Sequence, residues 1–204
     1  MCSSCQIGAA QRRATGKGRY VELPASKGGH GHLKAGDCVP GQRISVDHYE
    51  SQVKGHSWGS YGKSKEDQMY CGGTIFVDHA SGLIHVEHQV SLGTMDTLSS
   101  KHAFERMAFS NGVVIQKYHG DNGAVFTSHE FNKHIIEMEQ GFTFSGVGAH
   151  HQNGVAERAI QTVVTHARTM MLHAAIRWPA MADAALWPMA LSHSAYLWNI
   201  TIRE

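Results

Sequence analysis

The chain has 204 residues, of which 42% are hydrophobic and 17% are charged, a composition that allows one substantial core and argues against a disordered protein. Its four cysteines are too few and too scattered for a disulfide framework. No window approaches the roughly 18 uncharged apolar residues of a membrane span, and the first residues lack the charged-then-apolar order of a signal peptide. We expect a soluble protein in a reducing compartment.

The formal net charge is only +1, but the charges are unevenly distributed. Residues 1–46 carry seven Lys or Arg against two Asp or Glu, whereas residues 47–152 carry seven against twelve. A basic arm could neutralise phosphates, and an acidic middle suits a site that holds divalent cations. Composition alone leaves open the alternative of a solvated tail on an acidic domain.

The first 40 residues contain half of a possible zinc site followed by a linker. Cys2 and Cys5 form a CxxC pair, and two further ligands are needed for a structural tetrahedron. His30 and His32 are separated by a single residue, a poor ligand spacing, and no pair among the sixteen histidines has a zinc-ligand arrangement. We expect no structural Zn²⁺ here, and the segment 6–41 is interpreted as an extended basic linker.

The rest of the chain alternates between strand-like and helix-like patterns. Asp47 lies in a β-prone run that includes Ile44, Val46 and Tyr49, so we expect a strand with a carboxylate near its centre. An isolated aspartate in a buried strand is costly unless it is paired or metal-bound, although an exposed edge-strand aspartate is the alternative. A loop is predicted over residues 52–73.

Further elements follow in chain order. Two short strands joined by the sequence HASG indicate a hairpin, and Asn153 is a candidate N-cap for the long helix near the end. The predicted elements are strands at 74–78 and 83–90, a helix at 94–110, a strand at 113–118, a helix at 128–139, a glycine-rich loop at 141–151, a helix from Asn153 to about Ala174, and a last helix at 180–199.

Two acidic residues lie in distinctive sequence motifs, at a distinctive distance from each other along the chain. Asp121 begins DNG just after an apolar strand, and Glu157 lies in QNGVAER at the start of the long helix. They are separated by 157 − 121 − 1 = 35 residues. A strand end and a helix can direct two carboxylates into one pocket, and oxygen-only ligands suit Mg²⁺ or Mn²⁺. A third, upstream carboxylate would complete a two-metal site for phosphodiester chemistry.

At these residues the chain resembles the integrase core of retroviruses and long-terminal-repeat retrotransposons, and the words around the acids resemble copia-type elements most. The resemblance implies an α/β, ribonuclease-H-like fold, with a mixed five-stranded sheet flanked by helices and the first acid on the first strand. That order favours Asp47 over Asp78, which we expect to cap the hairpin. The implied division is a finger remnant and linker at 1–40, a catalytic core at 41–175 and a following helix at 176–204.

The resemblance further implies that Asp47, Asp121 and Glu157 are both catalytic and metal-binding residues, holding two Mg²⁺ or Mn²⁺ ions. The expected partners are DNA and further copies of the chain, in the nucleus or the cytoplasm, including a virus-like particle. Candidate DNA-contacting or loop-positioning residues are Asn122, Gln152, Asn153 and Gln161.

His119 could equally be a structural histidine or a phosphate contact, and sequence leaves this open. Three alternatives to an integrase also stay open: a nuclease of the same fold, a non-enzymatic nucleic-acid-binding remnant, and a genomic relic that does not fold stably.

Overall fold

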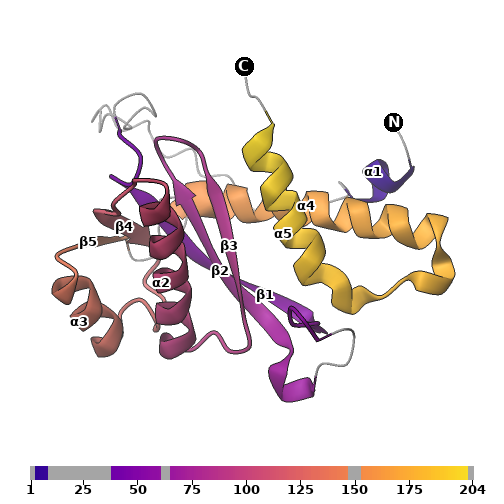
Figure 1. Ribbon diagram of the computed structural model, residues 1–204, viewed down its shortest axis with the longest axis horizontal. Coiled ribbons are helices and arrows are strands. Elements are labelled where there is room, and N and C mark those ends of the chain that lie inside the picture. The colour runs from indigo at the N-terminus through magenta and orange to yellow at the C-terminus, as the bar shows by residue number, and fades with distance from the viewer. Residues whose placement is uncertain (1–2, 9–37, 61–64, 147–152, 202–204) are drawn as a thin grey trace, which may run out of the picture.

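The architecture is a mixed five-stranded sheet with helices on both faces (Figure 1). The computed structural model describes residues 3–8, 38–60, 65–146 and 153–201. The strands are β1 (Ile44–Gly55), β2 (Tyr70–Asp78), β3 (Ile84–Gln89), β4 (Lys117–Gly120) and β5 (Gly141–Phe144). The helices are α1 (Ser3–Gly8), α2 (Thr94–Ser110), α3 (His129–Glu137), α4 (Gly154–Arg177) and α5 (Trp187–Ile200), with single 3-10 turns at η2 (Glu66–Gln68), η4 (Pro179–Met181) and η5 (Ala184–Leu186).

The strands lie in the order β3-β2-β1-β4-β5. The first three form an antiparallel meander, and β4 then pairs in parallel with β1 on one side and with β5 on the other. The long β1 is therefore central, with its two faces covered by different helices. This arrangement confirms the predicted fold class.

Two hydrophobic cores form, one on each face of the sheet. Successive side chains of a strand point to opposite faces, so β1 contributes to both cores. The core beneath α2 and α3 contains Ile44, Val46, Phe76, Phe104, Ala108, Ile115, Tyr118, Phe126, Phe131 and Ile135. The core beneath α4 and α5 contains Tyr49, Ile75, Val77, Ile84, Ala156, Ala159, Val163, Ala167, Leu191 and Ala195.

Two strands begin or end where the sequence pattern did not predict. The predicted loop at 52–73 is wrong at both ends, because β1 continues to Gly55 and β2 begins at Tyr70. The end of β1 is mostly exposed and polar, so it lacks the apolar alternation that marks a half-buried strand. Pairing with β2, with a register irregularity after Glu50, decides its conformation instead.

The strand predicted at 113–118 is displaced towards the C-terminus, since β4 spans Lys117–Gly120. Its apolar run fills the core from the connecting segment, where Ile115 is 5% exposed. The predicted loop at 141–151 is also wrong at its start, because residues 141–144 pair with β4 as strand β5. Residues 147–151 of that loop lie outside the described part.

The helix predicted at 94–110 is confirmed as α2, and α4 runs slightly beyond its predicted end. The predicted single helix at 180–199 is wrong, because the turns η4 and η5 precede α5. Pro188 lies in the first turn of α5, where a missing N–H is tolerated. The Asp183 side chain accepts a 2.8 Å hydrogen bond from the Ala185 N–H and so supports the preceding turn.

The first and last helices of the described chain, α1 and α5, each pack against α4, which extends beyond the sheet (Figure 1). Helix α1 lies so close to α4 that a Cβ on Gly8 would clash with Thr169. Residues 3–8 form a helix, whereas we expected an extended linker to begin at residue 6. Cys2, His30, His32 and most of the predicted linker lie outside the described residues. The division at residues 40 and 175 stays a prediction.

Helix α5 is tied to the edge strand β3 by a side chain that bonds to its backbone. The Asn199 Oδ1 accepts a 2.9 Å hydrogen bond from the Ile84 N–H, and its Nδ2 donates to the Ile84 carbonyl over 2.7 Å. The backbone N–H and carbonyl of Ile84 are thus both hydrogen-bonded. At a free sheet edge, such groups would bond to water or to another chain. No helix in the described part of the chain combines the length and apolar character needed to cross a membrane.

Candidate active site

Asp47 is the fourth of the twelve residues of β1 and lies on the face that looks towards α4. Alternation along the strand places it with Tyr49, a member of the core beneath α4, and opposite to Val46, which faces α2 and α3. One carboxylate oxygen, Oδ1, accepts a 2.8 Å hydrogen bond from the His48 N–H. The predicted strand around Asp47 is confirmed, but it continues to Gly55, so the carboxylate lies nearer its start than its centre.

Asp121 directly follows β4, the strand parallel to β1. Ser45 is paired with His119, so advancing two residues along each strand brings Asp121 beside Asp47. The Asp121 Oδ1 accepts a 3.0 Å hydrogen bond from the Gly123 N–H. A Cβ at Gly123 would lie only 2.9 Å from that same oxygen, so a larger residue there would push the carboxylate out of this orientation.

Glu157 lies in the first turn of α4 and is exposed. The start of this helix is attached to β1 through Asn153, whose Nδ2 donates a 3.2 Å hydrogen bond to the Val46 carbonyl. Asn153 is 1% exposed and occupies the N-cap position, as predicted, but its side chain makes no capping hydrogen bond to the helix. Its amide instead links the residue before Asp47 to the helix that carries Glu157.

The pKa of Asp47 reflects both its burial and the nearby charges of Asp121 and Glu157. Burial is the main cause that raises the pKa of Asp47 from 3.8 to about 6, against the lowering effect of the His48 hydrogen bond. The negative charges of Asp121 and Glu157 raise it further. Like charges have such an effect only when they are close, so the fold brings the three predicted acids into one electrostatic neighbourhood.

The carboxylate oxygens of Asp47, Asp121 and Glu157 are not all close enough to one another to form a single cluster of ligand atoms. Within the described residues, one group of three or more His, Cys, Asp or Glu side chains has its ligand atoms within 4.8 Å of one another, and it consists of His102, Glu105 and His134. Asp47, Asp121 and Glu157 are therefore too widely spaced, as they stand, to share one ion. Ligands of a two-ion site lie farther apart, because the ions themselves are about 4 Å apart.

The weaker sequence candidates differ in their placement. The Asn122 Nδ2 donates a hydrogen bond to the Ser145 carbonyl, which joins the turn after Asp121 to the end of β5. Gln161 is exposed on α4, one turn after Glu157. Gln152 lies outside the described residues. Asn122 therefore links two loops through its side chain, and the side chain of Gln161 is exposed.

His119 and Asp78 are both buried and both make hydrogen bonds that support the fold. His119 is 7% exposed, and its Nδ1 lies 3.0 Å from the Thr143 hydroxyl on the neighbouring strand, which favours the structural interpretation. Asp78 shares the sheet face of Phe76, opposite to Asp47. Its Oδ2 accepts hydrogen bonds from the N–H and hydroxyl of Ser81, at 2.8 and 2.6 Å. The expectation that Asp78 caps the hairpin is confirmed.

A cavity of about 890 Å³ lies elsewhere, between β1, α4, η4, η5 and α5. Its lining is mostly apolar and includes Val164, Ala167, Met171 and Leu186, but none of the three acids. A concave apolar site suits a small molecule or a protein side chain. The acids instead lie on a strand, in the turn after a strand and in the first turn of a helix.

Comparison with known proteins supports the architecture. No protein-family model matches the chain, and no curated protein matches it. Among solved structures, the fold is that of integrase catalytic cores, with a ribonuclease-H-like mixed sheet flanked by helices. At 16–17% sequence identity, this similarity establishes the fold.

Three solved structures illustrate it. The integrase catalytic core of HTLV-2 in complex with magnesium, in its dimeric form, has a TM-score of 0.53 at 17% identity, over 80% of this chain and 90% of that chain. The trimeric form has a TM-score of 0.50 at 17% identity, over 78% and 85%. A chain of the simian T-cell lymphotropic virus intasome, in complex with a PP2A regulatory subunit, has a TM-score of 0.58 at 16% identity over 81% of this chain. That match spans about half, 51%, of the viral chain.

Proposed function

We propose that this protein is a metal-dependent polynucleotidyl transferase that joins element DNA ends to target DNA, as the integrase of a copia-type retrotransposon. The observation that carries the proposal is geometric: the parallel pairing of β1 with β4 places Asp121 beside Asp47, and the Asn153–Val46 hydrogen bond attaches the start of the helix that carries Glu157 to β1. In keeping with this arrangement, the charges of both acids contribute to the raised pKa of Asp47. Three acids distant in sequence thus interact on a fold shared with integrase cores. Two of these acids lie in the motifs DNG and QNGVAER, which resemble those of copia-type elements.

The donor set fits magnesium or manganese. All three side chains offer carboxylate oxygens, the ligands that these hard cations prefer. Burial and like charge disfavour the ionised form of Asp47, and a bound cation would reverse that penalty. In this proposal Asp47, Asp121 and Glu157 would together hold the two ions. Bound ions of this kind activate an attacking water or hydroxyl and stabilise the leaving oxygen.

The protein's other residues hold these carboxylates in place. Gly123 and His48 donate backbone hydrogen bonds to Asp121 and Asp47 respectively, which orients each carboxylate before a cation arrives. Asn153 fixes the start of α4 against β1 and so positions Glu157. Preorganised ligands bind a metal without the cost of ordering them during the reaction.

DNA recognition is proposed along the exposed side of α4. Gln161 and Arg168 are exposed and follow Glu157 by four and eleven residues, which places them on the same side of the helix. Contacts to the DNA backbone from such side chains would position a duplex without reading its bases. We therefore propose target joining that is nearly independent of sequence.

We further propose that the active form is a homo-oligomer, because joining two element ends to one target requires more than one active site. The HTLV-2 integrase core of this fold is described in a dimeric and in a trimeric form, and the simian T-cell lymphotropic virus structure is described as an intasome. The nuclear or cytoplasmic location, including a virus-like particle, stays a prediction.

The test is a Mn²⁺- or Mg²⁺-dependent assay on labelled duplex DNA with recessed element-end strands. Glu157→Gln should reduce joining and cleavage by at least about 100-fold, since it removes a charged ligand while keeping the side-chain volume. Glu130→Gln is the matched control, because Glu130 is also an exposed glutamate in the first turn of a helix. It should retain full activity.

The products distinguish the competing functions. Joined products in the wild type and none in Glu157→Gln support the integrase. Cleavage without joining would replace it with a nuclease of the same fold. DNA binding with no metal-dependent product would favour a non-enzymatic remnant. Melting temperatures of both variants within a few degrees of the wild type would exclude misfolding as the cause.

A further inference from the structure

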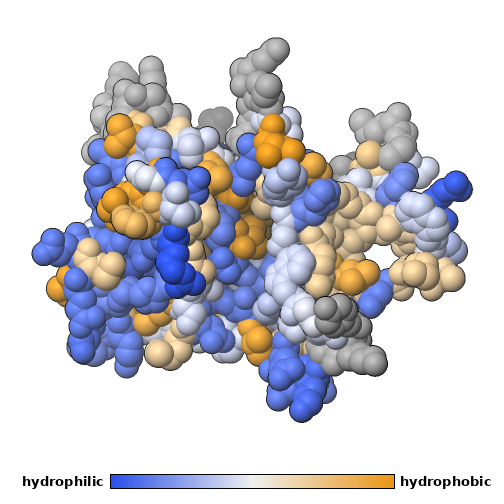
Figure 2. Space-filling model, viewed as in Figure 1, coloured by the Kyte–Doolittle hydropathy of each residue, from blue (hydrophilic) through white to orange (hydrophobic). Residues whose placement is uncertain are grey.

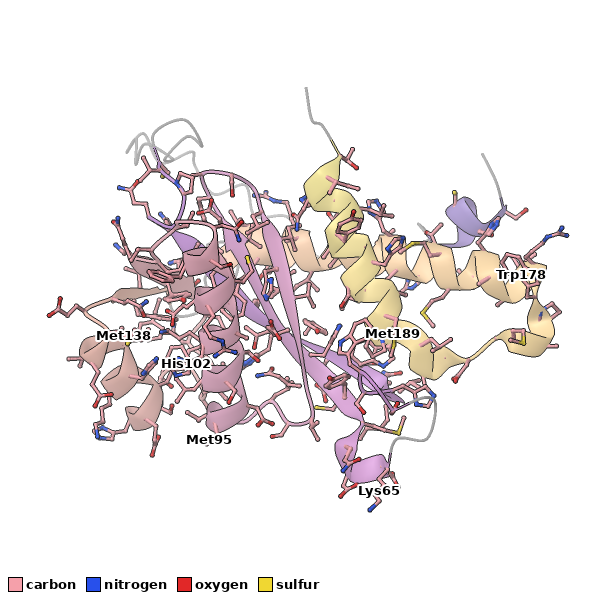
Figure 3. All side chains as sticks on the ribbon, viewed as in Figure 1. Lys65, Met95, His102, Met138, Trp178 and Met189 are labelled. Carbon is pink, nitrogen blue, oxygen red and sulfur yellow. The ribbon has the colours of Figure 1, made fainter. Side chains whose placement is uncertain are left out.

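A group of three potential metal ligands lies on the sheet face opposite to Asp47. His102 and Glu105 are on α2, and His134 is on α3. Their ligand atoms lie within 4.8 Å of one another, and the centroids of the two imidazole rings are 4.5 Å apart. Figure 3 labels His102 on α2, beside α3, and hydrophilic residues gather over these two helices in Figure 2.

We propose that His102, Glu105 and His134 form a Zn²⁺ site that clasps α2 to α3, separate from the carboxylates around Asp47.

The Glu105 carboxylate is oriented for such a role. Its Oε1 accepts three hydrogen bonds, from Lys101 Nζ at 2.8 Å, the Tyr118 hydroxyl at 2.8 Å and Gln140 Nε2 at 2.6 Å. These three donors saturate Oε1, so Oε2 is the oxygen left for a metal. Carboxylate ligands are commonly held by hydrogen bonds of this kind, which fix their direction.

Two buried atoms next to this carboxylate lack hydrogen-bond partners among the described residues: His134 Nε2 and Gln140 Oε1. Gln140 Nε2 already faces two acceptors, Glu105 Oε1 and the Ile115 carbonyl, so exchanging the amide atoms would not satisfy its oxygen. Buried polar atoms are rarely left without partners. A cation coordinated by His134 would satisfy its ring nitrogen, and a water on that cation could donate to Gln140 Oε1.

The ligand chemistry selects zinc over magnesium. Two imidazole nitrogens and one carboxylate oxygen suit Zn²⁺, whereas Mg²⁺ prefers oxygen ligands alone. Tetrahedral zinc with bonds of about 2.1 Å places neighbouring ligand atoms about 3.4 Å apart, so small side-chain rotations would close the shell. Three protein ligands leave the fourth position to water. The site should therefore bind zinc more weakly than a four-ligand structural site.

Bound zinc would strengthen a short helix that has few attachments. Helix α3 has nine residues and contributes Phe131 and Ile135 to the core beneath it. A metal shared with α2 adds a cross-link between the two helices in the folded state only. Zinc should therefore raise the melting temperature in a concentration-dependent way.

The experiment measures the melting temperature of the full chain with and without ZnCl₂, together with the absorption spectrum of bound Co²⁺. Saturating zinc should raise the wild-type melting temperature by roughly 5 °C or more. His134→Ala and His102→Ala should each reduce this rise to below about 1 °C. His129→Ala is the control, since His129 is an exposed histidine on the same helix. It should keep the full rise.

The Co²⁺ spectrum separates this site from cysteine ligands such as Cys5. Tetrahedral visible bands without a thiolate charge-transfer band, at one ion per chain and absent from His134→Ala, support the site. The proposal is overturned if the wild type is not stabilised by zinc, or if His134→Ala and His102→Ala are stabilised as strongly as the wild type. A thiolate band retained in both variants would assign the ion to cysteine and overturn it as well. Unliganded melting temperatures near the wild-type value verify that the variants fold.

Discussion

The side-chain amide of Asn153 donates a 3.2 Å hydrogen bond to the main-chain carbonyl of Val46, across 107 residues of sequence. Val46 immediately precedes Asp47, and Asn153 immediately precedes the helix that carries Glu157. One hydrogen bond thus connects the backbones that bear the first and third predicted acids. Its partners are buried, so the bond is shielded from competition with water.

Asn153→Ala should therefore impair the site more than the fold. Loss of the bond leaves the buried Val46 carbonyl without this donor, at a cost of about 1–3 kcal/mol in the free energy of unfolding. Because Glu157 then loses its anchor, DNA joining should fall by at least about 10-fold, and more Mg²⁺ should be needed for half-maximal activity. Denaturant melts and a Mg²⁺ titration of the rate measure the two effects. An unchanged Mg²⁺ dependence would limit Asn153 to a structural role.

Because the pKa of Asp47 is raised, we expect the metal-free wild type and Asp47→Asn to differ in stability by an amount that depends on pH. This pKa is about 6 in the folded chain against 3.8 ordinarily, so between these values the folded state binds more protons than the unfolded state. This residue's contribution therefore becomes less favourable as pH rises from about 4 to about 6. Asp47→Asn, which cannot ionise, should be more stable than the wild type at pH 8 by about 1–2 kcal/mol and nearly equal to it at pH 4.

Chemical denaturation of both proteins at the two pH values, in the presence of EDTA, measures this difference. Saturating Mg²⁺ should then reverse the order at pH 8, because only the wild type offers the full set of carboxylates. Equal stabilities at pH 4 and pH 8 without metal would show that the environment of Asp47 does not penalise its charge.

Gly123→Ala should reduce activity without unfolding the protein. The added Cβ would lie 2.9 Å from the Asp121 Oδ1, so the carboxylate must rotate away from its present position. The turn is near the surface and can relax, so the melting temperature should fall by only a few degrees. DNA joining should fall by at least about 10-fold. Gly112→Ala is not a matched control, because Gly112 has a positive φ of 76°. Gly154→Ala is suitable, since a Cβ there meets nothing within 4 Å.

Asn199→Ala tests the attachment of α5 to the sheet. The variant loses both hydrogen bonds to Ile84, which leaves an N–H and a carbonyl of the edge strand without these partners. We expect the free energy of unfolding to fall by about 1–3 kcal/mol. The exposed strand edge should also increase aggregation. Light scattering and denaturant melts measure the two effects, and a variant as stable and as monodisperse as the wild type would contradict this role.

Much of the fold followed from local pattern. The helix at Thr94–Ser110 was predicted to the residue, because its apolar spacing ends at Asn111-Gly112, a strong stop. Strand β5 was missed although Phe142, Thr143 and Phe144 are β-prone, because four residues are too few to show a strand pattern and pairing with β4 fixes their conformation. The polar end of β1 was missed for the same reason. Backbone pairing between strands leaves little trace in the sequence of either partner.

The sequence by itself indicated which acids to group as a candidate site. The spacing of Asp121 and Glu157, the words around them and the β-prone run around Asp47 indicated the trio without coordinates. Only the tertiary structure decided how the trio is held, since the parallel pairing of β1 with β4 and the Asn153–Val46 bond join residues far apart in the chain. It also brought His134 to His102 and Glu105, where the HxxE pair on α2 was the one local sign. Motifs are local, whereas hydrogen bonds and metal ligands depend on distances that exist only once the chain has folded.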